Sequence, residues 1–205
     1  MAGSYSYLPL GLRVLRKIEA VVREEMNAIG GQEILMSMLH PKALWETTGG
    51  WDSIDVLFKV PSRTEKEYAL GQSEEELVTP LVLKYATTYK DLPLAVYQIH
   101  WKFRDELRAK SGVLRGREFL MKDMYSYHRD QTDLDAFYEK AIQAYKNVYA
   151  RTGIGDKTYL TFASGGMFSK FSHEFQTICD AGEDVVYIDD EKGIAVNDEV
   201  MQDEV

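Results

Sequence analysis

The amino-acid sequence predicts an α+β fold in which helices flank a mostly antiparallel sheet. Two stretches repeat apolar residues at helical spacing, and between them lie two extended segments rich in aromatic and large apolar residues. These segments, residues 97–106 and 117–127, are joined by a basic loop that contains glycine, which predicts a hairpin with a charged tip. The chain has 205 residues and 45% hydrophobic content, enough for one globular domain or a large piece of one.

The composition excludes several classes of protein. The formal net charge of −9 argues against binding nucleic acid over the whole surface, so any such contact must be local. The lone cysteine, Cys179, cannot form an internal disulfide, and no CxxC pair offers a zinc site, which favours the reducing cytoplasm. The sequence has no apolar run of about 18 residues, no signal-peptide pattern and no GxxxxGK[ST] loop. We therefore expect a cytoplasmic protein without a membrane partner.

The first predicted element is a long amphipathic helix that begins near Pro9, where a fixed φ and a missing N–H do least harm. Its apolar stripe consists of Leu15, Ile18, Val22, Met26 and Ile29. The glycines at 30 and 31 end the helix, and a strand is expected at residues 33–39. Taken alone, this pattern favours an ordinary core helix packed on a sheet.

The remaining elements follow from periodicity and turn residues. Residues 40–51 predict a short helical piece in which Trp45 and Trp51 are packing residues. The other expected elements are strands at 56–60 and 67–70, helices at 77–88 and from about 134 to Gly153, strands at 158–163 and 185–188, and a last short strand beginning at Ile194. The sequence contains no internal repeat.

The acidic stretch GQSEEE, residues 71–76, has two interpretations. Three consecutive carboxylates are typical of a solvated helix start, where they complement the helix dipole. Alternatively, Ser73-Glu74-Glu75 resembles the Thr-x-Glu loop of prolyl-tRNA synthetases, and the resemblance implies that the Ser73 hydroxyl and the Glu75 carboxylate receive a cationic amine, because a buried ammonium group needs charge pairing and saturated hydrogen bonds.

The hairpin carries the candidate functional side chains. Alternate residues of a strand face one side, so Arg104 and Glu106 are expected to point together. The same rule places on one face the residues Arg117, Phe119, Met121, Asp123 and Tyr125. Charged, aromatic and apolar groups on one face suit a ligand, whereas the alternative is an exposed hairpin with surface ion pairs worth about 0–1 kcal/mol each. The histidines His40, His100, His128 and His173 show no short ligand spacing, so no metal site is predicted.

The string FRDE, the loop that carries Arg115, and the string REF at 117–119 resemble motif 2 of class II aminoacyl-tRNA synthetases. The longer string FRDELRAKSGVLRGREFLMKDMYSYH is similar to prolyl-tRNA synthetases of the bacterial type, as are LPLGLRVLRKIEAVVREEM, LWETTGGW and SHEFQTICDAGED. The resemblance implies a partial class II catalytic domain over residues 1–205, with motif 1 at about 9–41, motif 2 at about 97–128, and a homodimer formed through motif 1. Two positions depart from the family: Ser37 stands where a proline is usual, and Gln72-Ser73-Glu74 stands where Pro-Thr-His is common.

The resemblance also implies a reaction. The carboxylate of proline attacks the α-phosphorus of ATP, pyrophosphate leaves, and the prolyl group passes to the acceptor end of tRNA(Pro). The implied catalytic residue is Arg104, which would bridge the α-phosphate and the substrate carboxylate. The residues implied in ATP binding are Arg104, Glu106, Arg115, Arg117 and Phe119. Those implied in proline binding are Ser73, Glu75, Arg104, Met121, Asp123, Tyr125 and His173, with Phe168 or Glu174 as further wall residues. Mg²⁺ would be held largely by the phosphates, so no protein metal ligands are expected.

In the family a third motif, an anticodon-binding domain and often an editing insertion complete the enzyme, and we expect none of them within these 205 residues. The chain is thus expected to be the front part of a catalytic domain, with weak or no activity alone. A non-catalytic synthetase-like paralogue that binds protein or RNA is the alternative.

Overall fold

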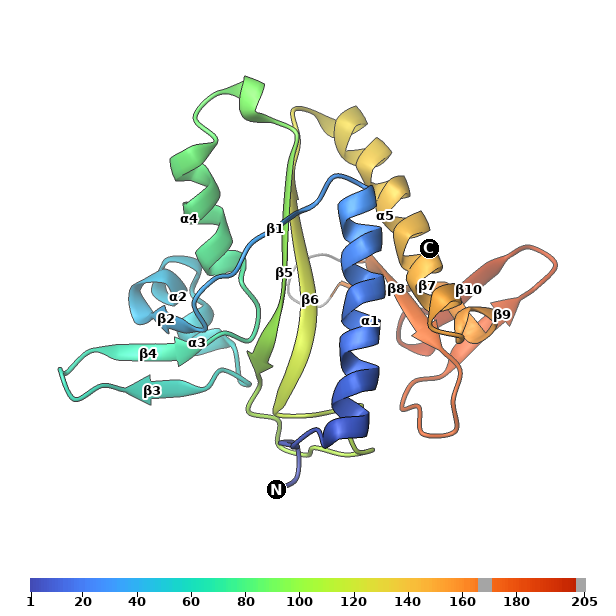
Figure 1. Ribbon diagram of the computed structural model, residues 1–205, viewed down its shortest axis with the longest axis horizontal. Helices are drawn as coiled ribbons and strands as arrows, with labels where there is room; N and C mark the ends of the chain where they lie inside the picture. The colour runs from blue at the N-terminus through green and yellow to red at the C-terminus, as the bar shows by residue number, and fades with distance from the viewer. Residues whose placement is uncertain (166–170, 202–205) are drawn as a thin grey trace. The chain divides into compact units, whose positions relative to one another are not determined.

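The computed structural model of the chain describes residues 1–165 and 171–201, and Figure 1 shows the course of its helices and strands. The chain divides into two units, 1–141 and 142–205, which are described separately. Whether the whole chain is one partial catalytic domain stays a prediction. The mixture of helices with mainly antiparallel strands confirms the α+β class.

The first unit contains two three-stranded sheets, ordered β1-β5-β6 and β2-β4-β3. Its strands are β1 (Gln32–Glu33), β2 (Leu39–Pro41), β3 (Lys59–Pro61), β4 (Glu67–Leu70), β5 (Leu94–Phe103) and β6 (Glu118–Tyr127). Its helices are α1 (Pro9–Ala28), α2 (Lys42–Thr48), α3 (Gly50–Ser53), α4 (Glu75–Tyr85), the short 3₁₀ helix η1 (Tyr89–Asp91) and the start of α5 (Gln131–Arg151).

The predicted hairpin is confirmed as the antiparallel pair β5–β6. Its register runs from Leu94 opposite Tyr127 to Phe103 opposite Glu118. The strands end earlier toward the tip than expected, because Arg104 follows β5 and Arg117 precedes β6. The alternation of faces that holds within a strand therefore does not reach these two arginines.

The two faces of the hairpin pack against different helices. On one face, the Tyr97 hydroxyl donates to Asn27 Oδ1 of α1 at 2.7 Å. On the other face, Val96 and the partly buried Tyr125 pack with Val78 of α4 in one apolar core. Figure 1 accordingly shows α1 and α4 beside the β5–β6 pair. The second face, on the α4 side, is the one that also carries the candidate site.

The first helix forms as predicted, with Pro9 in its first turn and Met26 buried. The strand expected at 33–39 is wrong over residues 34–38, because β1 ends at Glu33 and β2 begins only at Leu39. In the gap, the Met36 N–H donates to the side-chain oxygen of Gln98 at 3.0 Å instead of to a strand backbone. A side-chain acceptor on the neighbouring strand thus replaces part of the expected ladder.

The smaller sheet has its own apolar core, formed by Trp45, Trp51, Leu57 and Ala69. Both tryptophans are buried, which confirms the prediction that they are packing residues. Gly49 separates α2 from α3 with a φ of 77°, a left-handed conformation that side chains other than glycine adopt at a cost.

The second unit contains the rest of α5, the strands β7 (Thr158–Ser164), β8 (Phe171–Thr177), β9 (Val186–Asp189) and β10 (Ile194–Asn197), and the 3₁₀ helices η2 (Gly155–Lys157) and η3 (Asp198–Val200). The sheet order is β8-β7-β10-β9. Three of these strands lie within a few residues of where they were expected, whereas β8 was not predicted. It pairs antiparallel with β7, and its Phe175 ring stacks on Tyr145 of α5 at 5.4 Å.

Candidate active site

The candidate site is built where the 71–74 loop, between β4 and α4, meets the ends of β5 and β6. The Phe103 N–H donates to the Gly71 carbonyl oxygen at 3.0 Å, which ties the loop to the end of β5. Gly71 is itself required by close packing, because a Cβ there would lie 2.8 Å from Glu74 Oε1 and 3.0 Å from His40 Nε2. The sequence therefore holds this loop directly against the hairpin.

A cluster of four buried charged or titratable side chains underlies the loop; we call His40, Glu74, Lys102 and Asp123 the buried ionic cluster. Lys102 Nζ lies 2.9 Å from Asp123 Oδ1 and 3.5 Å from Glu74 Oε1. His40 Nε2 lies 3.0 Å from Glu74 Oε2. Each of these carboxylates thus has a nitrogen partner, as buried charges require.

Tyr125 connects this cluster to the loop backbone. Its hydroxyl donates to Asp123 Oδ2 at 2.8 Å and accepts from the Glu74 N–H at 2.9 Å. The side-chain amide of Gln98 also donates to Asp123 Oδ2, at 3.3 Å. Burial raises the pKa of Tyr125 far above its usual value, and the charges of Glu75 and Asp123 raise it further. Tyr125 therefore stays a protonated donor.

Arg104 lies just beyond β5, beside the loop and the Phe119 ring. Its guanidinium carbon is 5.3 Å from the centroid of that ring, and Nη2 lies 3.5 Å from the Gln72 carbonyl oxygen. Arg104 Nε is buried and has no hydrogen-bond partner among the described residues. A buried guanidinium nitrogen without an acceptor is costly unless a ligand supplies one.

A buried acceptor follows this loop, in the first residue of α4. Glu75 Oε2 is buried and likewise has no hydrogen-bond partner within the described part of the chain. Two residues before it, Ser73 Oγ accepts from the Gln72 side-chain amide at 2.9 Å. The loop thus presents a hydroxyl and the start of α4 presents an anionic acceptor, while Arg104 presents a cationic donor beside the loop.

His100 and Met121 face each other across the two strands on the same side as Asp123. Burial lowers the pKa of His100, and the nearby Lys102 ammonium lowers it further. His100 Nδ1 is buried without a hydrogen-bond partner in the described residues.

Sequence reasoning missed the functional position of four side chains, namely His40, Glu74, Gln98 and Lys102. Strand alternation was a signal for Gln98 and Lys102, because they share the face of β5 that pairs with the predicted face of β6.

Arg117, expected on the ligand face, instead binds main-chain carbonyls. Its Nε donates to the Glu106 carbonyl oxygen at 2.8 Å, Nη1 to that of Ala2 at 3.0 Å, and Nη2 to that of Leu107 at 3.3 Å. Arg115 lies at the exposed hairpin tip, where its backbone forms an isolated antiparallel β-bridge with that of Lys110. A role of these two arginines in binding phosphates stays a prediction.

Two further predicted residues belong to residues 142–205 of the chain. His173 is exposed on β8 of the second unit, where its ring contacts Phe162 at a centroid distance of 4.7 Å. Phe168 lies outside the described residues. Among the described residues, no group of three or more His, Cys, Asp or Glu side chains could hold a metal ion.

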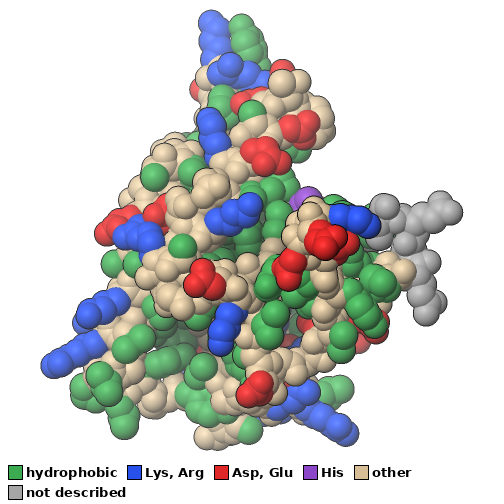
Figure 2. Space-filling model, turned by 90° about the vertical axis from the view of Figure 1, so that its right-hand side faces the viewer, with side chains coloured by type: hydrophobic (Ala, Val, Ile, Leu, Met, Phe, Trp, Pro, Cys, Tyr) green, Lys and Arg blue, Asp and Glu red, His purple; other side chains and the backbone are tan. Residues whose placement is uncertain are grey.

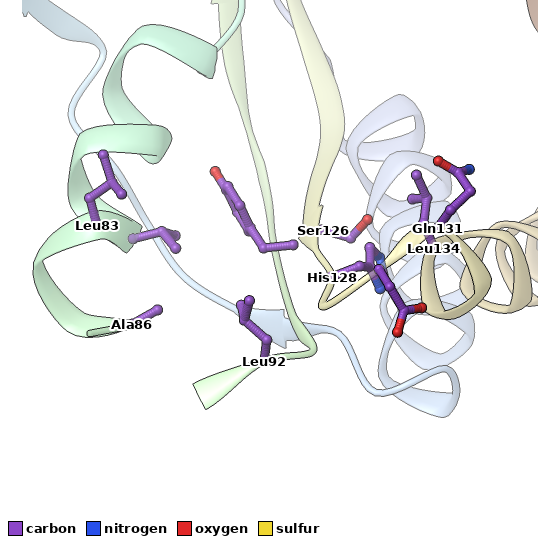
Figure 3. A pocket seen from close by; sticks show the side chains of 10 residues that line it. Leu83, Ala86, Leu92, Ser126, His128, Gln131 and Leu134 are labelled. Atoms are coloured by element: carbon purple, nitrogen blue, oxygen red, sulfur yellow. The ribbon is translucent and has the colours of Figure 1, made fainter. Parts of the chain in front are cut away.

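A separate open cavity of about 480 Å³ lies between the end of α4, the end of β6 and the start of α5 (Figure 3). Leu83 and Ala86 line it from α4, and Leu92, His128 and Leu134 line it from the other segments. None of the predicted site residues is among the residues that line it.

The surface and helices add two observations. On the face that Figure 2 shows, the described lysine and arginine side chains lie scattered among acidic and apolar ones, in line with the negative net charge. Within residues 1–165 and 171–201, none of the helices has both the length and the apolar character that crossing a membrane requires.

Comparison with known proteins identifies the family. The sequence profile of the tRNA synthetase class II core domain (G, H, P, S and T) matches residues 58–191. The chain belongs to this family. The match includes the β5–β6 hairpin and the 71–74 loop, so the candidate site lies within the class II synthetase core.

Curated relatives of this class II core are proline–tRNA ligases. The chain is 46% identical over 200 residues to that of Bacillus cytotoxicus, and 45% identical over 200 residues to that of Geobacillus thermodenitrificans. Each alignment covers 97% of this chain and 35% of the relative. The chain therefore spans about a third of the length of the curated relatives it matches.

Solved structures share the fold of this class II core. A Giardia lamblia prolyl-tRNA synthetase in complex with prolyl-adenylate has a TM-score of 0.68 and 21% identity, covering 74% of this chain and 32% of that one. A Cryptosporidium parvum prolyl-tRNA synthetase complexed with L-proline and AMP has a TM-score of 0.69 and 17% identity, covering 82% of this chain and 33% of that one. These likenesses confirm the class II synthetase-like fold.

Proposed function

We propose that this chain contributes the amino-acid and nucleotide site of a proline–tRNA ligase. The observation that carries the proposal is a pair of buried atoms beside the 71–74 loop that have no hydrogen-bond partner among the described residues: the acceptor Glu75 Oε2 and the donor Arg104 Nε. A zwitterionic amino acid would satisfy both, its ammonium group at Glu75 and its carboxylate at Arg104. The 46% identity to a proline–tRNA ligase, and the prolyl-adenylate bound by a fold relative, support proline as that amino acid.

The proposed roles follow from this placement. Ser73 and Glu75 receive the ammonium group of proline, and Met121 offers an apolar contact to its ring. Arg104 bridges the proline carboxylate and the α-phosphate of ATP. Phe119 stacks on the adenine, which suits its place directly beside the Arg104 guanidinium.

The chemistry needs positioning and charge neutralisation rather than a covalent intermediate on the protein. A carboxylate oxygen of proline attacks the α-phosphorus, the bond to the bridging oxygen of pyrophosphate breaks, and Arg104 stabilises the negative charge that develops. A hydroxyl of the terminal tRNA ribose then takes the prolyl group, and AMP leaves. Mg²⁺, when bound, neutralises the phosphates, which would supply most of its ligands.

Three outer residues complete the nucleotide site in this proposal. Glu106 accepts from the adenine amino group, and Arg115 reaches the outer phosphates from the exposed hairpin tip. Arg117 supports them indirectly, since its hydrogen bonds to the Glu106 and Leu107 carbonyls shape the base of that tip. His173 remains a proposed proline-binding residue.

We further propose a homodimer formed through α1, contact with the acceptor end of tRNA(Pro), and a cytoplasmic location. The support for the dimer is an exposed apolar stripe on α1 that consists of Leu10, Val14 and Ile18. The support for the location is a lone, exposed and free Cys179, which suits a reducing compartment.

The test is a titration of the 205-residue chain with a non-hydrolysable prolyl-adenylate mimic, followed by calorimetry and by melting temperature. Because a ligand that binds only the native state stabilises it, saturating mimic should raise the melting temperature. The matching alanyl-adenylate mimic should bind at least tenfold more weakly. Absence of both heat and a melting shift with the prolyl mimic would refute the proposal and favour a non-catalytic synthetase-like protein.

A pair of variants separates the amino-acid site from the nucleotide site. Glu75→Gln keeps the shape but removes the charge, so proline and the prolyl mimic should bind at least tenfold more weakly while AMP affinity stays unchanged. Glu65→Gln is the matched control, because Glu65 lies at the exposed turn between β3 and β4. Unchanged proline affinity in Glu75→Gln would remove Glu75 from the site.

A further inference from the structure

We infer that Lys102 is a positioning residue that holds the 71–74 loop in place. The inference rests on the proposed function, since it assigns a role toward the same proline site. It concerns the buried ionic cluster, none of whose members except Asp123 was expected at the site. Lys102 touches no proposed ligand atom; it acts through the two carboxylates on either side of it.

The burial of Lys102 is the first step of the argument. Its side chain is 0% exposed, and its ammonium group lies between Asp123 Oδ1 at 2.9 Å and Glu74 Oε1 at 3.5 Å. Lysine is almost never fully buried unless it is paired. Taking an ammonium ion out of water is expensive, and a pair of apolar residues at the same place is often as stable. Stability alone therefore does not explain this arrangement.

Two routes lead from Lys102 to the loop. The direct route is the contact with the Glu74 carboxylate, which His40 Nε2 holds from the other side at 3.0 Å. The second route runs through Asp123, whose Oδ2 accepts from the Tyr125 hydroxyl, and that hydroxyl accepts from the Glu74 N–H. Side chain and backbone of Glu74 are thus both fixed. Glu74 lies between Ser73 and Glu75, the two residues proposed to receive the ammonium group of proline.

The same contacts define what Asp123 does. Its Oδ1 faces Lys102, and its Oδ2 accepts from Gln98 Nε2 at 3.3 Å and from the Tyr125 hydroxyl at 2.8 Å. Because one Asp123 oxygen faces the Lys102 ammonium and the other binds two protein donors, we assign Asp123 a positioning role, whereas the family resemblance implied direct contact with proline. The ammonium group is then left to Glu75, whose Oε2 has no partner in the described residues.

A positioning role and a purely structural role predict different measurements. If Lys102 only stabilises the fold, its loss lowers the melting temperature, and affinities for proline and AMP fall together or not at all. If it positions the loop, proline affinity falls selectively. Proline affinity also stays low in a variant whose charge balance is restored, because the contact between Lys102 and the Glu74 carboxylate is still missing.

The experiment compares Lys102→Met with the charge-balanced double variant Lys102→Met/Asp123→Asn. The double variant removes one positive and one negative charge, and the amide oxygen introduced at position 123 can still accept from Gln98 and Tyr125. It therefore keeps the test valid even where the single variant fails to fold. Lys84→Met is the matched control, because Lys84 is exposed in the last turn of α4. The readouts are melting temperature and calorimetric dissociation constants for L-proline and for AMP.

We expect Lys102→Met to lower the melting temperature and the double variant to recover most of that loss. In the double variant, the dissociation constant for proline should stay at least tenfold above that of the unmodified chain, with that for AMP within twofold. Lys84→Met should change neither. Recovery of proline affinity together with the melting temperature would overturn the inference. If the unmodified chain binds no proline, the proposed function fails, and the inference fails with it. If the unmodified chain binds proline and no variant alters that binding, only the inference is contradicted.

Discussion

The guanidinium of Arg104 lies over the Phe119 ring, 5.3 Å from its centroid. Phe119 is opposite Lys102 in the ladder, and Arg104 follows two residues after Lys102, so the contact joins the end of β5 to the start of β6. A cation over an aromatic face is held by the ring's negative charge density. The contact fixes Arg104 at the site while Nε stays available to a ligand.

Replacing Arg104 by alanine should therefore abolish most of the binding of a prolyl-adenylate mimic. Removal of one charge-stabilising donor costs about 2.7–4 kcal/mol in comparable oxyanion sites, or a factor of roughly 10²–10³. The measurement is the calorimetric dissociation constant of the mimic for the 205-residue chain. Arg108→Ala is the control, because Arg108 is exposed on the hairpin loop. Equal affinities for the two variants would contradict the assignment of Arg104.

Introducing a methyl group at Gly71 should disturb the buried ionic cluster. The added carbon would lie 2.8 Å from Glu74 Oε1, and that side chain is fully buried and paired with His40 and Lys102. Overpacking of this kind typically costs about 1–3 kcal/mol. Gly71→Ala should thus lower the free energy of unfolding, measured by urea denaturation, and weaken proline binding. A neutral substitution would show that Glu74 relaxes freely.

Gly11→Ala is the matched control for this variant. Gly11 lies in the first turns of α1, and its Cβ would have only Tyr7 nearby, at 3.8 Å. Alanine is favoured over glycine in helices by about 0.5–1 kcal/mol, so this substitution should raise the free energy of unfolding.

The hairpin and the composition of its candidate face were predictable because aromatic, β-branched and charged residues alternate there with the period of a strand. Phe119, Met121 and Asp123 indeed share the face that packs toward α4. The alternation of faces along a strand did not predict the position of Arg117, which lies one residue before β6, because periodicity does not reveal where a strand begins.

The buried ionic cluster was not predictable from local pattern. Its members come from β2, the 71–74 loop, β5 and β6, and only the fold brings these segments together. Glu74 in particular stands in a run of three carboxylates that is typical of a solvated helix start, yet it is fully buried. What decides its role is the pairing with His40 and Lys102, a relation between residues distant in sequence.

The Arg23–Glu33 ion pair should make stability depend on acidity. Arg23 Nε donates to Glu33 Oε2 at 2.7 Å and Nη2 donates to Oε1 at 2.9 Å. These hydrogen bonds lower the pKa of the Glu33 carboxyl below its ordinary value. A lowered folded-state pKa means that the stabilisation is present above the unfolded-state pKa and is lost as the pH falls through the folded-state pKa.

A double-mutant cycle of Arg23→Gln and Glu33→Gln isolates this contribution. Because both side chains are more than a third exposed, the coupling energy at pH 7 should be only about 0.2–1 kcal/mol. It should fall toward zero as the pH is lowered from 4.5 to 2.5, about two units below the ordinary glutamate pKa. The measurement is urea denaturation of the four proteins at each pH. A coupling energy that grows in acid would contradict the sign of the shift.

The exposed stripe of α1 should mediate the proposed homodimer. Leu10, Val14 and Ile18 recur every four residues and are 76%, 50% and 41% exposed, although apolar residues at this spacing normally pack against a partner. Val14→Glu/Ile18→Glu places two charges on the stripe and should shift the chain to monomer in sedimentation equilibrium, with secondary structure unchanged. Arg16→Glu makes the same change in net charge away from the stripe, at a position that is also exposed, and should leave the dimer intact. A chain that sediments as a monomer before substitution would contradict dimerisation, and a dimer that survives both variants would place the interface elsewhere. Because the double variant and its control alter the net charge equally, the difference between them reports the change on the stripe itself and not the change in net charge.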